Sequence, residues 1–120
     1  AGIIAQTCQR LTAPLHQCLV WLGPAIGPKA FEVGKDVLDG FIAQGWSQEH
    51  VNAAFKSCDS VGAKWLGDLN YLARVTLLQQ GALSTNIYGG EWCTVSDSQR
   101  FYSYRRSKDV GRMVSLIWIK

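Results

Sequence analysis

Apolar residues recur at helical spacing in three successive stretches of the chain, which are therefore predicted to be helices. The first begins at Lys35. The second follows Ser47, whose hydroxyl can accept a hydrogen bond from a free N–H of the first turn, and its apolar stripe places Cys58 on the buried side. The third begins near Ala63 and fades at Gly81. The middle of the chain is thus predicted to be helical.

The segments on either side of these helices have the pattern of strands and turns. Residues 18–22 predict a short buried strand within an otherwise irregular N-terminal part. Residues 83–88 predict a strand that leads into Gly89-Gly90, a dipeptide typical of hairpins. Two further short strands are expected at 91–96 and 100–105, which makes the C-terminal half rich in hairpins.

The last segment, residues 110–119, fits two kinds of structure. Its β-branched and aromatic residues favour a strand, although the same apolar positions also fit a helix. The chain as a whole is predicted to be α+β, with two or three helices packed on a small antiparallel sheet. A length of 120 residues is that of one domain, so residues 1–120 are predicted to form a single domain.

The cysteine count changes the picture of where such a chain would work. An even number of cysteines in a small chain favours two disulfides and an oxidising compartment; the alternative is four free, buried thiols. The four are Cys8, Cys18, Cys58 and Cys93, and the sequence leaves their pairing open. The first residue is Ala rather than Met, which fits a chain whose signal peptide has been removed. A secreted protein is therefore predicted.

Catalytic and metal-binding patterns are not found in the sequence. The two histidines, His16 and His50, lie in unrelated contexts, and the cysteines lack the short spacing of a zinc site. Neither a nucleophile elbow nor a phosphate-binding glycine loop occurs. We therefore predict no enzymatic activity, no metal and no cofactor. A small secreted hydrolase that uses either histidine is the alternative.

The basic residues gather at one end of the chain. Residues 100–120 carry six Lys or Arg and one acid, a net +5, whereas residues 1–99 carry six bases and eight acids, a net −2. Such a segment can attract an anionic partner, or it can protect the edge of a strand from pairing. If the segment is extended, Arg100, Tyr102, Tyr104 and Arg106 share one face, because alternate residues of a strand point the same way. The candidate binding residues are Arg100, Tyr102, Tyr104, Arg106 and Arg112.

The C-terminal half also carries a family resemblance. Its marks are Cys58, the run GEWCTV at 90–95, the aromatic segment 101–104 and Asp109-Val110. In this order and residue type the chain resembles the killer-toxin-like secreted proteins of fungi and their necrosis-effector relatives. The resemblance implies a small, processed, disulfide-bonded α/β sandwich that acts on other cells.

The predicted function follows from these observations together. It is a small, secreted, disulfide-stabilised effector or killer-toxin-like protein that acts without enzymatic activity. Its partner would be a protein of the target cell, or an anionic surface such as a membrane or a cell wall. The alternative for the basic segment is a nucleic-acid-binding module, in which phosphates meet the bases and the aromatic rings stack.

Overall fold

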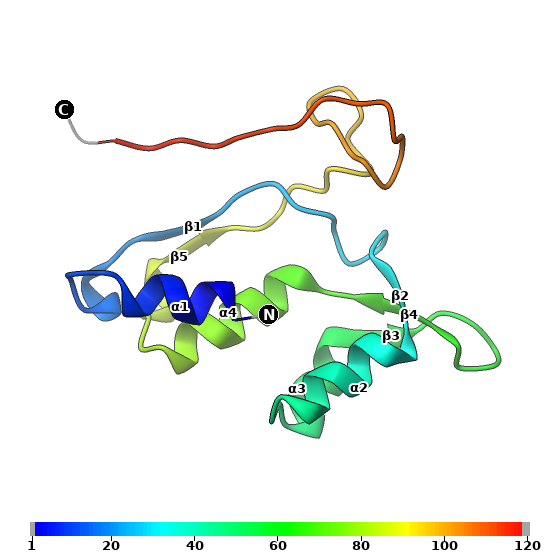
Figure 1. Cartoon of the computed structure of the whole chain (residues 1–120), viewed down its shortest axis with the longest axis horizontal. Coiled ribbons are helices and arrows are strands. Elements are labelled where there is room, and N and C mark those ends of the chain that lie inside the picture. Colours follow the sequence, from blue (N-terminus) through cyan, green and yellow to red (C-terminus); the bar gives the residue numbers. More distant parts are fainter. Residues whose placement is uncertain (1, 119–120) are drawn as a thin grey trace.

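The computed structural model describes residues 2–118, which form an α+β fold (Figure 1). The described chain has four α-helices: α1 (Ile3–Gln9), α2 (Lys35–Ala43), α3 (Gln48–Ala54) and α4 (Leu69–Gln79). Its strands are β1 (Val20–Leu22), β2 (Glu32–Gly34), β3 (Phe55–Ser57), β4 (Lys64–Gly67) and β5 (Ile87–Gly89). Short 3₁₀ turns lie at Leu15–Gln17 and Ser84–Asn86.

The helices form where local signals are strongest. The helix predicted from Lys35 is confirmed as α2, and Lys35 Nζ lies 2.8 Å from Asp39 Oδ1 one turn later. The helix predicted after Ser47 is confirmed as α3. Ser47 caps it as predicted, since its Oγ accepts a hydrogen bond from His50 N over 3.3 Å. The third helix, α4, begins later than predicted, where Asp68 Oδ1 accepts from Tyr71 N over 2.9 Å.

The strands form two small sheets. In the first, β4 lies between β2 and β3, and both neighbours are antiparallel to it, so a small antiparallel sheet is present, but its strands are not those predicted from the sequence. In the second, β1 and β5 pair in parallel, with Val20 opposite Ile87. A hairpin at Gly89-Gly90 was therefore the wrong prediction. The two glycines have φ of +77° and +91°, and a Cβ on Gly89 would lie 2.3 Å from Leu22 O.

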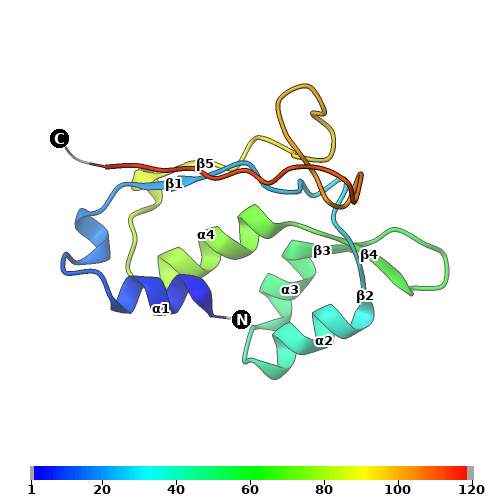
Figure 2. The same cartoon turned by 45° about the horizontal axis from the view of Figure 1, so that its top comes forward.

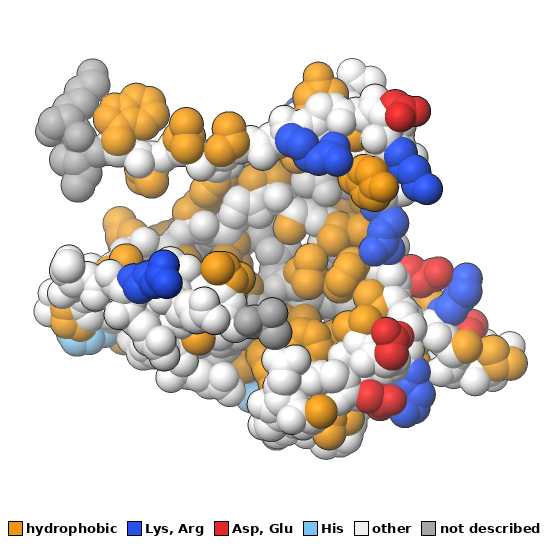
Figure 3. Space-filling model, viewed as in Figure 1, with side chains coloured by type: hydrophobic (Ala, Val, Ile, Leu, Met, Phe, Trp, Pro, Cys, Tyr) orange, Lys and Arg blue, Asp and Glu red, His pale blue; other side chains and the backbone are white. Residues whose placement is uncertain are grey.

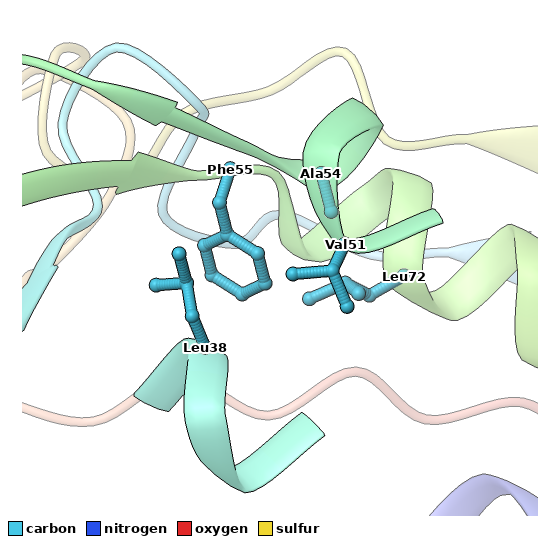
Figure 4. Close-up of a cluster of buried hydrophobic side chains, with 5 residues drawn as sticks. All are labelled: Leu38, Val51, Ala54, Phe55 and Leu72. Atoms are coloured by element: carbon cyan, nitrogen blue, oxygen red, sulfur yellow. The ribbon is translucent and has the colours of Figure 1, made fainter. Parts of the chain in front are cut away.

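Two separate apolar cores hold these elements together. The first core lies between α2, α3, β3 and α4 (Figure 4), and Phe55 at its centre is only 1% exposed. Its members are Leu38, Val51, Ala54, Phe55 and Leu72. The second core lies where α4 meets the 3₁₀ turns and β5, and its members are Leu15, Leu77, Ala82 and Ile87. Figure 1 and Figure 2 show α4 extending from beside α1 toward α3, and this helix supplies Leu72 to the first core and Leu77 to the second.

The N-terminal part is more regular than its sequence indicated. Residues 3–9 form the helix α1, which packs against α4. The predicted strand at 18–22 is present as β1, but Trp21 in its middle is 59% exposed rather than buried.

The cysteines do not form the two predicted disulfides. Cys8, Cys18, Cys58 and Cys93 are all free. Cys58 is also exposed rather than buried, because α3 ends at Ala54 and the chain continues into β3. The helical stripe that assigned Cys58 to the core stops before it reaches that residue.

The chain after β5 is largely irregular. A parallel bridge joins Ala25 to Cys93, but the strands predicted at 91–96 and 100–105 are not formed. Residues 110–118 are neither helix nor paired strand, and residue 119 of that predicted segment lies outside the described residues. The hairpin-rich C-terminal half was therefore a wrong prediction. Figure 1 shows the end of the chain extending past β1 and β5.

Candidate functional site

A cavity of about 480 Å³ opens where the end of β1 meets the basic C-terminal segment. Its volume lies in the range of small-molecule sites. The turn after β1 supplies Gly23 and Pro24, and the rest of the lining comes from residues 100–104 and 111–115. The lining side chains that can bind a polar ligand are Arg100, Tyr102, Tyr104, Arg112 and Ser115.

Backbone hydrogen bonds next to the cavity join the two parts of the chain that line it. Ala25 N donates to Trp92 O over 3.3 Å, and Thr94 N donates to Ala25 O over 2.9 Å. These bonds join the turn after β1 to residues 92–94, which precede the basic C-terminal segment. The lining residues are therefore held by contacts between segments that are distant in the sequence.

Arg106 holds the C-terminal segment in shape. Its Nη1 donates to Thr94 O over 2.7 Å and to Val95 O over 2.8 Å, and its Nη2 donates to Phe101 O over 2.7 Å. A guanidinium group can satisfy several carbonyls at once because its five N–H groups point outward in one plane. Arg106 thus fixes the loop that carries Arg100 and the tyrosines.

Arg100 is positioned by an acid and an aromatic ring. Its Nε donates to Asp97 Oδ2, and its guanidinium carbon lies 3.8 Å from the centroid of the Trp92 ring. Desolvation raises the pKa of Asp97, but hydrogen bonds from Arg100 and its charge outweigh this effect and hold that pKa below its ordinary value. The side chain of Arg100 remains half exposed at the mouth of the cavity.

Arg112 and the tyrosines form the other part of the lining. The Arg112 guanidinium carbon lies 5.2 Å from the centroid of Tyr104, and Arg112 Nη1 donates to Val110 O over 2.9 Å. The Tyr102 ring lies so close to Gly111 that a Cβ there would be 3.1 Å from Tyr102 Cε2. Tyr102 and Tyr104 are nevertheless each more than half exposed.

Cys93 lies next to this cavity in a shallower depression that it shares with Trp92 and Arg100. Its Sγ accepts hydrogen bonds from Gly27 N over 3.2 Å, from Ser96 N over 3.4 Å and from Ser96 Oγ over 3.3 Å. Burial raises the pKa of the Cys93 thiol, but these hydrogen bonds favour the thiolate more strongly and lower that pKa to about 7.

The structure brings together four of the five candidate binding residues and separates the fifth. The cavity is lined by Arg100, Tyr102, Tyr104 and Arg112. Arg106 does not line it, because its guanidinium group donates to three backbone carbonyls instead. The chain turns at residues 104–106 instead of continuing as a strand, so the alternation of faces ends there. Gly23 and Pro24 were missed, although the run GPAIGP at 23–28 signals a tight turn.

The donor atoms of a metal centre are not gathered in the described residues. No group of three or more His, Cys, Asp or Glu side chains lies close enough to hold an ion within residues 2–118. His50 Nδ1 lies 2.9 Å from the hydroxyl of Tyr71, and the backbone carbonyl of His16 lies 3.4 Å from Asn86 Nδ2. None of the helices in this part of the chain has the length and apolar composition needed to cross a membrane.

Two arginines and two tyrosines thus lie around one cavity of an α+β chain. Its sequence matches a known family over all of residues 1–120, and the chain belongs to that family, which is described as multi-copper polyphenol oxidoreductase laccase. The fold agrees with that of solved relatives. A Neisseria meningitidis protein is 39% identical, and the likeness covers 88% of this chain and 40% of that one with a TM-score of 0.76.

Curated relatives carry a different description. A purine nucleoside phosphorylase of Pseudomonas aeruginosa is 44% identical over 120 residues, which is 100% of this chain and 47% of that protein. The purine nucleoside phosphorylase YfiH of Escherichia coli is 41% identical over 119 residues, or 99% of this chain and 46% of that protein. The chain thus spans less than half the length of these relatives.

These findings correct the functional predictions made from the sequence. The chain belongs to a different family from the fungal killer-toxin-like proteins, and its relatives are bacterial proteins named as enzymes. The prediction of a toxin or effector without enzymatic activity is therefore wrong, and the findings give no support to the alternatives, a nucleic-acid-binding module and a small secreted hydrolase. The prediction of secretion is wrong too, since it depended on disulfides that are not formed and on the toxin resemblance.

Proposed function

We propose that this chain supplies part of the substrate site of a purine nucleoside phosphorylase. The observation that carries the proposal is the convergence of Arg100, Arg112, Tyr102 and Tyr104 on one cavity. Two guanidinium groups suit a phosphate, and two exposed phenol rings suit a flat purine base. The names of the relatives that match the whole chain support the same substrates.

The arginines retain donors for an anion. Among the described residues, Arg100 donates from Nε to Asp97, and Arg112 donates from Nη1 to carbonyls of its own turn. A guanidinium group has five N–H donors, so each arginine keeps others that can reach a ligand. The stacking of Arg100 on Trp92 and of Arg112 near Tyr104 limits the directions in which these donors point. The anionic partner predicted for the basic segment would then be phosphate.

The reaction itself defines what the cavity must do. In phosphorolysis a phosphate oxygen forms a bond to C1′ of the ribose, the bond from C1′ to the purine nitrogen breaks, and its electron pair leaves with the base, which takes up a proton. Positive charge is needed beside the phosphate, and an aromatic surface is needed beside the leaving base. Arg100 and Arg112 would orient the phosphate, while Tyr102 and Tyr104 would hold the base.

Copper chemistry has less support in these residues. A copper site is built from clustered imidazole and sulfur ligands, and residues 2–118 bring no such cluster together. The side chains described here therefore do not by themselves fit the metal in the family's description, whereas they do offer anion and aromatic contacts. No step of the proposed reaction passes through a metal held by these residues.

The proposal can be tested in a chimera in which this chain replaces the matching 120 residues of the Pseudomonas aeruginosa relative. Conversion of inosine to hypoxanthine and ribose 1-phosphate, followed by chromatography with and without orthophosphate, measures the activity. Arg100→Gln and Arg112→Gln should each lower kcat/KM for phosphate about 10- to 100-fold, because a hydrogen bond to a charged group is worth about 1.5–3 kcal/mol.

The matched control is Arg10→Gln, at the residue that follows α1. Neither α1 nor Arg10 lines the cavity, and the substitution changes the net charge by the same amount. It should leave kcat/KM unchanged. Unaltered kinetics in both cavity variants, in a chimera that does convert inosine, would show that phosphate binds elsewhere. A folded chimera without phosphate-dependent activity would contradict the proposed reaction itself.

A further inference from the structure

The parallel pair β1 and β5 is too small to be a complete sheet. Each strand has only three residues, and parallel sheets in proteins are covered on their faces and extended by further strands. Here apolar side chains remain in solvent on the pair and just before it. Trp21 is 59% exposed and Tyr88 is 54% exposed, and Leu19 is still more so.

The end of the described chain also lacks a neighbouring strand and exposes apolar side chains. Residues 113–118, the C-terminal tail, are extended but pair with no strand within residues 2–118. Ile117 is 98% exposed, and its neighbours Leu116 and Trp118 are about three-quarters exposed. In the space-filling view the apolar side chains of the tail stand clear of the rest of the molecule (Figure 3).

The tail and the pair lie on the same side of the molecule. At Gly23 an added Cβ would lie 3.4 Å from the Trp21 ring and 4.0 Å from Ser115 Oγ, so the tail passes the end of β1 at that point. Beyond Ser115 it continues along β1 and β5 with an open gap between them (Figure 1, Figure 3). An extended apolar segment beside an open sheet edge is a template for strand addition.

The relatives indicate what fills this gap. They match the whole of this chain, yet 53% or more of their own length lies outside the match. The Neisseria meningitidis structure shares the fold over 88% of this chain and also has 60% of its residues outside the likeness. Each of these three relatives therefore carries a further segment, larger than the matched part, that could cover such a surface.

We propose that β1, β5 and the C-terminal tail form a docking surface for the part of the family's sequence that these 120 residues do not span. That part would add strands between the tail and the β1–β5 pair and cover Leu19, Trp21, Tyr88 and Ile117. The surface next to the cavity would then be closed by the same contact, since Val114 and Ser115 of the tail belong to both.

Hydrogen exchange in the chimera described above tests this proposal without reference to activity. The backbone amides of residues 116–118 should exchange rapidly in the 120-residue chain and at least about 100-fold more slowly in the chimera, where strand pairing would protect them. Ile117→Asp should lower the Tm of the chimera. The equivalent change Val61→Asp, at an 81% exposed position in the turn between β3 and β4, should leave it unchanged.

Two results would overturn the proposal. Rapid exchange of residues 116–118 in a folded chimera would show that the tail stays free. A homodimer of the 120-residue chain in sedimentation analysis, with the same amides protected, would show that a second copy covers the surface instead. Loss of phosphorolysis with protection intact would count against the proposed function alone.

Discussion

The main-chain N–H of Gly27 donates a hydrogen bond to Cys93 Sγ over 3.2 Å and so joins two loops that lie 66 positions apart in the sequence. The close approach favours a glycine, because a Cβ at this position would be 3.0 Å from Cys93 Cβ. Together with the two donors of Ser96 it stabilises the thiolate and lowers the pKa of Cys93 to about 7 from the ordinary value of 9.0.

Alkylation of Cys93 by iodoacetamide should therefore rise with pH to a midpoint near 7, as followed by peptide mass analysis. Ser96→Ala removes the hydroxyl donor and should shift that midpoint upward. Ser98→Ala, in the same loop but not bonded to the sulfur, should leave it in place. An unshifted midpoint in Ser96→Ala would show that the hydroxyl does not stabilise the thiolate.

The same pKa shift makes folding stability depend on pH. Because the folded-state pKa of Cys93 is depressed, the thiolate's contribution is fully present above the unfolded thiol's value near 9.0. It is lost as the pH falls to about 7. The urea midpoint of the wild type should therefore fall between pH 9 and pH 7 by more than that of Cys93→Ala. Parallel curves for the two proteins would contradict this expectation.

Two glycine substitutions should change stability in opposite directions. A Cβ on Gly67 would lie 2.8 Å from Phe55 Cε1 and 2.9 Å from Phe31 Cδ1, so Gly67→Ala overpacks the first core and should cost about 1–3 kcal/mol. Gly40 lies within α2 with nothing within 4 Å of an added Cβ, so Gly40→Ala should stabilise by about 0.5–1 kcal/mol. Urea denaturation measures both, and changes of the same sign would contradict the packing described here.

Replacement of Arg106 should loosen the loop that carries the cavity residues. Arg106→Lys keeps the charge but cannot reach Thr94 O, Val95 O and Phe101 O together. Amide exchange in residues 94–107 should become about 3- to 10-fold faster, since a hydrogen bond is worth about 0.5–1.5 kcal/mol. Arg105→Lys, which loses one bond to Glu32 O, should have a smaller effect. Equal effects would show that Arg106 does not organise the loop.

Cys58→Ser should change the free energy of unfolding by less than about 0.5 kcal/mol, the range usual for a surface position. The thiol is exposed and unpaired, so the substitution leaves no cavity and removes no cross-link. Thermal or urea denaturation checks this value. A loss of 2 kcal/mol or more would indicate a cross-link or a buried position that the structure does not contain.

The sequence predicted well those features that depend on neighbouring residues. Helices α2 and α3 follow from local spacing and from the Ser47 cap, and both are present. The end of α3 could not be predicted in the same way. Phe55 leaves the helix because it pairs with Gly67 in β4, and that contact is between residues distant in the sequence. The helical stripe therefore assigned Cys58 to the wrong environment.

The glycine pair and the basic segment likewise show that local sequence predicts residue preferences but not contacts between distant residues. Positive φ at Gly89 and Gly90 suits a hairpin, but it equally suits a strand that ends beside Leu22. The arginines and tyrosines chosen by residue type do line one cavity, and their role in binding stays a prediction. The opposite roles of Arg100 and Arg106 could not be predicted, because they arise from a turn that three carbonyl contacts hold in place.

Helix α4 contributes Leu72 to the first core and Leu77 to the second. Arg74, between them, donates to Ile87 O over 3.1 Å and to Gly89 O over 2.8 Å, which ties the same helix to β5. If one core loses its packing, α4 loses contacts that keep it helical. The other core, which also packs on α4, is then destabilised as well. The two apolar regions should therefore melt as one cooperative unit, with α4 as the element that couples them.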